Sequence, residues 1–89
     1  MTHLFRGRRY TIECGRQRKL RGWCDDPGSV GKIINIPFKG DSLDDLTTIL
    51  HESLHACLWD IEEDSVEDTG DSMARLLWKL GWRKGKGRD

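Results

Sequence analysis

Five consecutive residues of this sequence combine side-chain types and a spacing that could do chemistry. His51, Glu52 and His55 form the pattern His-Glu-x-x-His. In a helix the two histidines lie one turn apart on one face, so both imidazoles can reach the same metal ion. A carboxylate beside the first histidine can accept a proton from water held by that ion. The pattern therefore predicts a zinc site with His51 and His55 as ligands and Glu52 as general base.

A catalytic zinc site of this type needs a third protein ligand, with water in the fourth position. A continuation to Gly and His at positions 58 and 61 is excluded, because these residues are Leu58 and Ile61. We expect the third ligand to be Glu67, twelve residues after His55 on a second helix that returns past the first. Its rivals lie near the connection, where acids also suit a helix start: Glu62, Glu63 and Asp64.

Further residues have predicted roles around such a site. Asp71, one turn after Glu67, is expected to accept a hydrogen bond from the second nitrogen of a ligand histidine. Gly70 lacks a side chain and would let the two helices approach closely. Tyr10 and His3 are candidate donors to the oxyanion of a hydrolytic reaction, with ordinary strand packing as the competing role for Tyr10.

Three strands are expected before the histidine motif. Alternation and β-forming residues predict strands over 8–14, 20–24 and 32–38, with residues 15–19 as a hairpin loop between the first two. Pro37 cannot donate to a ladder, so the third strand either lies at an edge or ends there. The motif itself requires a helix, which the next segment supplies.

Two helices are expected after the strands. Ser42 starts a helix over 42–59 that carries the histidines, and a glutamate helix follows over 63–81. Gly81 is placed to end the second helix, and residues 83–89 form a basic tail. The periodicity thus predicts an α+β fold in which a small three-stranded, mostly antiparallel sheet packs on two helices.

Length and composition place all of these elements in one domain, 1–89, whose first part, 1–40, is β-rich. The 89 residues are 36% hydrophobic and 34% charged, so the apolar core must be thin. A bound metal could therefore contribute to stability. Three cysteines without C-x-x-C spacing indicate reduced thiols rather than a disulfide framework: Cys14, Cys24 and Cys57. With no signal peptide and no apolar stretch long enough to span a membrane, we expect a cytoplasmic protein.

The net charge is zero, but the charges are segregated along the chain. Residues 1–23 carry seven Arg or Lys against Glu13 alone, whereas residues 25–72 carry thirteen acids and two lysines. No aromatic–basic alternation accompanies the basic segment, so nucleic acid is not the expected partner. The acidic middle favours a basic segment in a protein or peptide substrate. Nothing in the sequence indicates an oligomeric state.

The pattern His51-Glu52-x-x-His55, followed by Glu67-x-x-Gly70-Asp71, resembles the gluzincin metallopeptidases. Over nearly its full length the chain is also similar to very small phage-encoded proteins, including the run from Leu77 to Arg83. The resemblance implies a zinc metallopeptidase of the host cytoplasm, with Glu67 completing the zinc site and Asp71 bracing a ligand histidine. It also implies that the strand 32–38 could line the active-site cleft and pair with an extended substrate.

Three functions stay open at this point. The first is a zinc endopeptidase, which Glu52 favours because a purely structural site would tolerate its loss. The second is a non-catalytic, zinc-stapled binding or regulatory module in a phage–host interaction, favoured by the lack of a second, substrate-binding subdomain. The third is zinc-dependent hydrolysis of a substrate other than a peptide, such as a small amide. Nucleic-acid binding by the basic segment could accompany any of the three.

Overall fold

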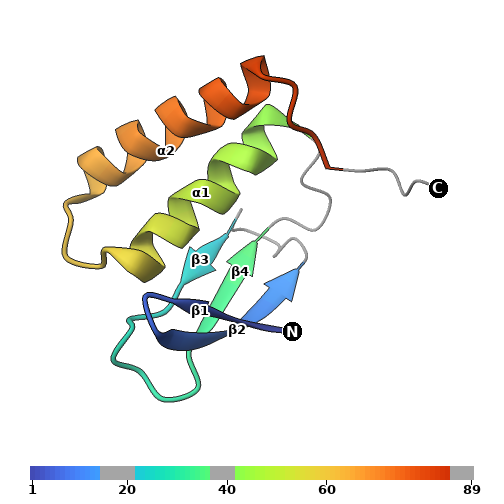
Figure 1. The fold of residues 1–89 in the computed structure, drawn as a ribbon. Coiled ribbons are helices and arrows are strands. Elements are labelled where there is room, and N and C mark those ends of the chain that lie inside the picture. Colours follow the sequence, from blue (N-terminus) through green and yellow to red (C-terminus); the bar gives the residue numbers. More distant parts are fainter. Residues whose placement is uncertain (15–21, 37–41, 85–89) are drawn as a thin grey trace.

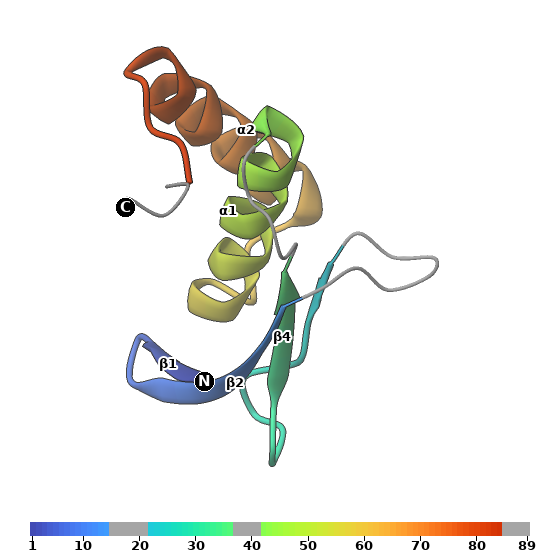
Figure 2. The same ribbon diagram turned by 90° about the vertical axis from the view of Figure 1, so that its right-hand side faces the viewer.

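The computed structural model of this protein describes residues 1–14, 22–36 and 42–84. Within these residues it contains the strands β1 (Thr2–Phe5), β2 (Arg8–Cys14), β3 (Trp23–Cys24) and β4 (Ile33–Ile36), and the helices α1 (Leu43–Cys57) and α2 (Glu63–Lys79). The sheet, α1 and α2 form three successive layers, with α1 in the middle (Figure 1, Figure 2). The α+β class is therefore confirmed.

The sheet has four strands in the order β1-β2-β4-β3 and is mixed. β1 and β2 are antiparallel, β2 and β4 are parallel, and β4 and β3 are antiparallel. The prediction of three mostly antiparallel strands is wrong in number, and of the three pairings observed two are antiparallel and one is parallel. It missed β1, which is joined to β2 by a tight turn with left-handed φ angles of 52° at Arg6 and 83° at Gly7. An Arg-Gly pair lacks the Asn or Asp that usually signals such a hairpin turn.

β4 occupies the centre of the sheet, between β2 and β3. The predicted hairpin between the strands 8–14 and 20–24 is therefore wrong, and its loop, 15–19, lies outside the described residues. β4 contains three isoleucines and is the most apolar strand, which suits a central position with a strand along each edge. The two-residue β3 suits the edge of the sheet. β4 ends at Ile36, so Pro37 follows the end of a central strand.

A small apolar cluster joins the sheet to the helix that carries the histidines. Tyr10, Ile34 and Ala56 are buried together, and four partly buried side chains pack around them: Phe5, Ile12, Cys24 and Ile36. The guanidinium of Arg6 adds a hydrogen bond, Nη1 to the carbonyl of Cys57 at 3.0 Å. The last turn of α1 is therefore fixed on the sheet immediately after His55.

Local capping sets the ends of the two helices. The hydroxyl of Ser42 accepts a hydrogen bond from the Asp45 amide at 3.0 Å, so Ser42 caps α1 as the sequence indicates. At the end of α2, Gly81 has a φ of 94°, and the amide of Trp82 donates to the Leu77 carbonyl. This is a Schellman-type ending, in which glycine takes the left-handed conformation.

The helix bounds differ slightly from the predicted ranges 42–59 and 63–81, because α1 ends at Cys57 and α2 at Lys79. Of the predicted tail, 83–89, only residues 83 and 84 are described; Arg83 stacks on the Trp78 ring at 3.3 Å from its centroid. Neither helix of the described chain has the length and apolar character needed to cross a membrane.

Candidate metal centre

The two histidines of the motif lie side by side on α1. Their Nε2 atoms are 3.1 Å apart, and the ring centroids are 4.7 Å apart. Both side chains are about four-fifths buried. The helix therefore holds two imidazole nitrogens toward one point, as the four-residue spacing predicts.

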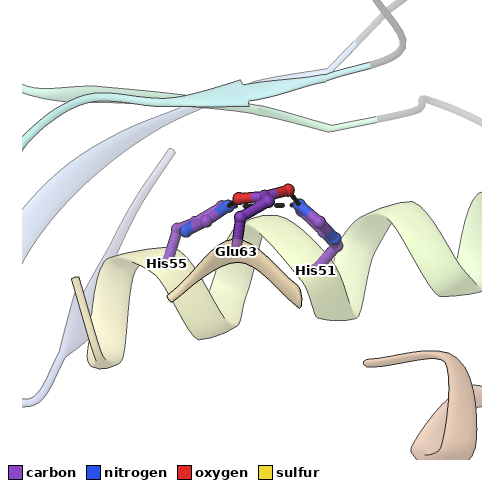
Figure 3. A group of neighbouring side chains, drawn as sticks. All are labelled: His51, His55 and Glu63. Carbon is purple, nitrogen blue, oxygen red and sulfur yellow. Dashed lines mark hydrogen bonds and ion pairs between the residues drawn. The ribbon is translucent and has the colours of Figure 1, made fainter. Parts of the chain in front are cut away.

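Glu63, the first residue of α2, completes a cluster with these histidines. Its carboxylate spans both rings, with one oxygen 3.0 Å from His51 Nε2 and the other 3.0 Å from His55 Nε2 (Figure 3). The glutamate side chain is 62% exposed, so the cluster is open to solvent on the side of α2.

The cluster fits a metal ion in both spacing and donor chemistry. The ligand atoms that His51, His55 and Glu63 offer lie within 4.8 Å of one another. Bonds of about 2.0–2.1 Å in tetrahedral geometry place neighbouring ligand atoms roughly 3.3 Å apart, close to the separations of 3.0–3.1 Å seen here. Each neutral imidazole can donate at most one proton from Nε2, so hydrogen bonds alone cannot satisfy all three contacts among the two rings and the carboxylate. A cation, in contrast, attracts all three groups at once. This group could therefore bind a metal ion.

The short connection between the helices brings Glu63 to the histidines. α1 ends at Cys57 and α2 begins at Glu63, so five residues reverse the chain direction. Two backbone hydrogen bonds tighten this reversal, from the Leu58 amide to the Leu54 carbonyl and from the Ile61 amide to the Leu58 carbonyl. The first turn of α2 consequently lies beside the last turns of α1.

The structure does not bring the predicted ligand Glu67 into this group. Glu67 is exposed one turn further along α2, and Glu63, one of its rivals in the sequence, takes the position beside the histidines. The carboxylate of Asp71 pairs with Arg75 instead of a histidine: its Oδ2 accepts a hydrogen bond from Arg75 Nε at 2.9 Å. Glu67 and Asp71 both lie further along α2 than Glu63, the residue that the structure places beside the histidines.

Gly70 lies where the two helices are in contact. A Cβ atom at this position would lie 3.4 Å from the His51 amide nitrogen and 3.5 Å from its Cα. The backbone of α2 therefore passes over the histidine helix, but at a distance where an added Cβ would make ordinary van der Waals contact, so the approach expected from a missing side chain does not require glycine here. Val66 and Ala74, one turn to either side, are the other buried residues of α2.

Glu52 is a buried carboxylate next to the cluster of His51, His55 and Glu63. The residue is 8% exposed. Burial raises the pKa of the Glu52 carboxyl, the nearby His51 lowers it, and the nearby Glu63 raises it further. A raised pKa makes the carboxylate a better proton acceptor, which suits the predicted general base.

The candidate oxyanion donors lie elsewhere. Tyr10 is fully buried in the core, where its hydroxyl donates to the Asp25 carbonyl at 2.9 Å and burial raises its pKa. His3 is on the exposed strand β1, with its ring against Phe5. Neither Tyr10 nor His3 is among the described residues that line the cavity beside His51, His55 and Glu63. For Tyr10 the competing role of strand packing is the one that the structure shows.

A cavity of about 530 Å³ adjoins the cluster of His51, His55 and Glu63. The described residues that line it come from β3 and the residue before it, from α1, from the connection between the helices and from the start of α2: Gly22, Trp23, Cys24, His51, Glu52, His55, Trp59, Ile61 and Glu63. The strand beside the site is thus β3, and β4, in the predicted range 32–38, is covered by β2 and β3. Trp23 and Trp59 form part of the cavity wall, which the sequence did not indicate, because a tryptophan in a short chain gives no signal that separates a core position from a cavity wall.

The fold and the site together define a small α+β protein with a His-His-Glu group able to bind a metal ion. Comparison with protein-family models, with curated proteins and with solved structures gave no match for this chain. Its function is therefore inferred from the geometry of the site.

Proposed function

We propose that this protein is a zinc-dependent metallopeptidase in which His51, His55 and Glu63 bind zinc and Glu52 is the general base. The observation that carries the proposal is the buried Glu52 carboxylate beside a triangle of two imidazoles and one carboxylate. Two histidines and one glutamate are a ligand set of catalytic zinc sites, and such a set leaves a position for water. A structural zinc site would be closed by a fourth protein ligand.

The residues of the chain would divide the work of hydrolysis. Zinc, when bound, supplies a lowered pKa for water and polarises the substrate carbonyl. Glu52 accepts the proton of the attacking water and passes it to the leaving amine. Its burial favours the first of these steps, because a carboxyl group with a raised pKa binds the proton more readily.

The surroundings of the cluster support a peptide as the substrate. β3 is an edge strand of the described sheet and lines the cavity, so the side of β3 that no described strand occupies could pair with an extended backbone. Trp23 and Trp59 offer apolar surface on the same cavity. This arrangement favours an extended chain over a small amide, and it transfers to β3 the substrate-pairing role expected of the strand 32–38.

Zinc content and cleavage of a peptide library test the proposal. We expect unaltered protein to bind one zinc ion per chain and to cut peptides. Glu52→Gln should keep the zinc and lose about 10²–10⁴-fold in rate, because only proton transfer is removed. Equal cleavage by both proteins, or unchanged cleavage after treatment with a chelator, would contradict the proposed mechanism.

A second function is that of a non-catalytic binding module in which zinc only stabilises the fold. The small hydrophobic core favours this function. Only five hydrophobic residues among those described are buried: Tyr10, Ile34, Ala56, Val66 and Ala74. A metal joining α1 to α2 would offset such a small core. The same experiment separates the two functions, since a module binds zinc, cuts no peptide and is unaffected by Glu52→Gln.

A further inference from the structure

One side of α2 has apolar side chains that no described element covers. Among the described elements α2 packs against α1 alone, through the small residues Val66, Gly70 and Ala74. Beside that contact Met73, Leu76 and Leu80 are 43%, 57% and 66% exposed. Contiguous exposed apolar side chains of this kind mark interaction surfaces. We refer to these three residues as the α2 stripe.

The spacing of the α2 stripe fits a partner helix. With the exposed Thr69, its members follow one another at intervals of four, three and four residues. This is the a/d spacing by which one helix packs along another. The stripe lies on a different side of α2 from Glu63, because each residue advances the helix by about 100°. A helix docked on the stripe would therefore leave the cluster of His51, His55 and Glu63 accessible.

The charges of α2 indicate which helix fits. Residues 62–71 carry six acids and no Arg or Lys, whereas residues 75–84 carry four Arg or Lys and no acid. A partner helix must present the same two blocks in the opposite direction. A second α2, running antiparallel, does this by symmetry. The zero net charge of the chain also means that two copies do not repel each other at long range.

We propose that the α2 stripe is an interface between two copies of this chain, with their α2 helices antiparallel. In this arrangement Met73 of one copy lies against Leu76 of the other, and Leu80 lies against Thr69. The acidic Asp68 then approaches the basic Lys79 of the second copy. Three apolar side chains per copy make a small interface, so the dimer dissociates at micromolar concentrations.

Sedimentation equilibrium of the full chain tests the interface, with and without a chelator. From about 1 µM to about 500 µM, unaltered protein should pass from one to two chain masses, because this range spans a micromolar dissociation constant. Leu76→Asp should stay at one chain mass throughout. The matched control is Val30→Asp, which places the same charge at a fully exposed position away from α2 and should dimerise normally. Circular dichroism checks that each variant is folded.

The orientation has its own test in the charges. Asp68 and Lys79 are eleven residues, about 16 Å, apart on one helix and cannot pair within a chain. Lys79→Glu should weaken the dimer several-fold, and Asp68→Lys combined with Lys79→Glu should restore it, since the pair is then reversed.

Each result decides the proposal. One chain mass at all concentrations in unaltered protein overturns it, as does a dimer that survives Leu76→Asp or one that Val30→Asp also abolishes. A dimer lost in Leu76→Asp but not rescued by the double charge exchange overturns the antiparallel arrangement. These readouts do not depend on zinc or on cleavage, so they succeed or fail separately from the proposed peptidase activity.

Discussion

At the scale of single residues, the third metal ligand is the sharpest question. Glu63 contacts both histidines at 3.0 Å, whereas Glu67 is exposed one turn further along α2. We expect Glu63→Gln to weaken zinc binding by at least about 100-fold, since even residues that only support a ligand contribute 10–100-fold. Zinc competition with a chromogenic chelator measures the affinity.

Glu67→Gln is the matched control for that measurement. It removes the same charge from the same helix, so any long-range electrostatic effect is common to both variants. We expect it to change zinc affinity by less than about 3-fold, as for an exposed charge screened by solvent. A larger loss in Glu67→Gln than in Glu63→Gln would return the ligand role to Glu67.

Glu52 predicts a pH dependence of stability in protein freed of metal by a chelator. Burial raises the pKa of its carboxyl above the ordinary value of 4.5, so the folded state prefers the proton. Below the unfolded-state pKa both states hold that proton, and ionisation costs nothing. As the pH rises from there through the raised folded-state pKa, ionising a buried group increasingly destabilises the fold.

Glu52→Gln removes this ionisation. Relative to unaltered protein, the free energy of unfolding of this variant should therefore become larger as the pH rises above about 4.5, the ordinary pKa of the carboxyl group. Urea denaturation at several pH values measures the difference. A difference that is constant over this range would show that Glu52 is not buried in the way that the structure describes.

At the scale of elements, two glycines at helix contacts make opposite predictions. At Gly70 an added Cβ would meet the His51 backbone at 3.4–3.5 Å, which is ordinary contact. Gly70→Ala should raise the free energy of unfolding by about 0.5–1 kcal/mol, because glycine inside a helix costs backbone entropy. At Gly22 the added Cβ would lie 2.8 Å from the Asn35 carbonyl oxygen. Gly22→Ala should lower that free energy by about 1–3 kcal/mol, as overpacking does.

Urea denaturation of the two alanine variants checks both signs. Because Gly22 also faces Glu52, with the added Cβ 3.4 Å from its Cγ, Gly22→Ala should reduce peptide cleavage as well. A destabilising Gly70→Ala would mean that the helices lie closer together than the structure shows.

At the scale of the whole molecule, zinc should contribute to the stability of the fold. The cluster joins α1 to the start of α2, and unfolding would separate its members. At free zinc 100-fold above its dissociation constant, a metal that binds only the folded state adds about 2.7 kcal/mol. We expect thermal unfolding with zinc to occur at a higher temperature than with a chelator. His51→Ala combined with His55→Ala is the control and should unfold at one temperature in both conditions.

The sequence by itself determined the elements whose chemistry is local. The spacing of His51 and His55 requires only one turn of helix, and the Ser42 cap and the Gly81 ending depend on neighbouring backbone groups. For this reason the side-by-side arrangement of the two histidines, the position of Glu52 beside them and both helices could be predicted.

Only the tertiary structure decided the features that depend on distant parts of the chain. The choice between Glu63 and Glu67 could not be made from periodicity, because residues four apart lie on nearly one face of α2. It depends on how far the five-residue connection carries α2 back along α1. Likewise, the local pattern identified β4 as a strand. Its central place between β2 and β3, which helps to bury its isoleucines, depends on strands that are distant in the sequence. That arrangement leaves β3 as the edge strand beside the cluster of His51, His55 and Glu63.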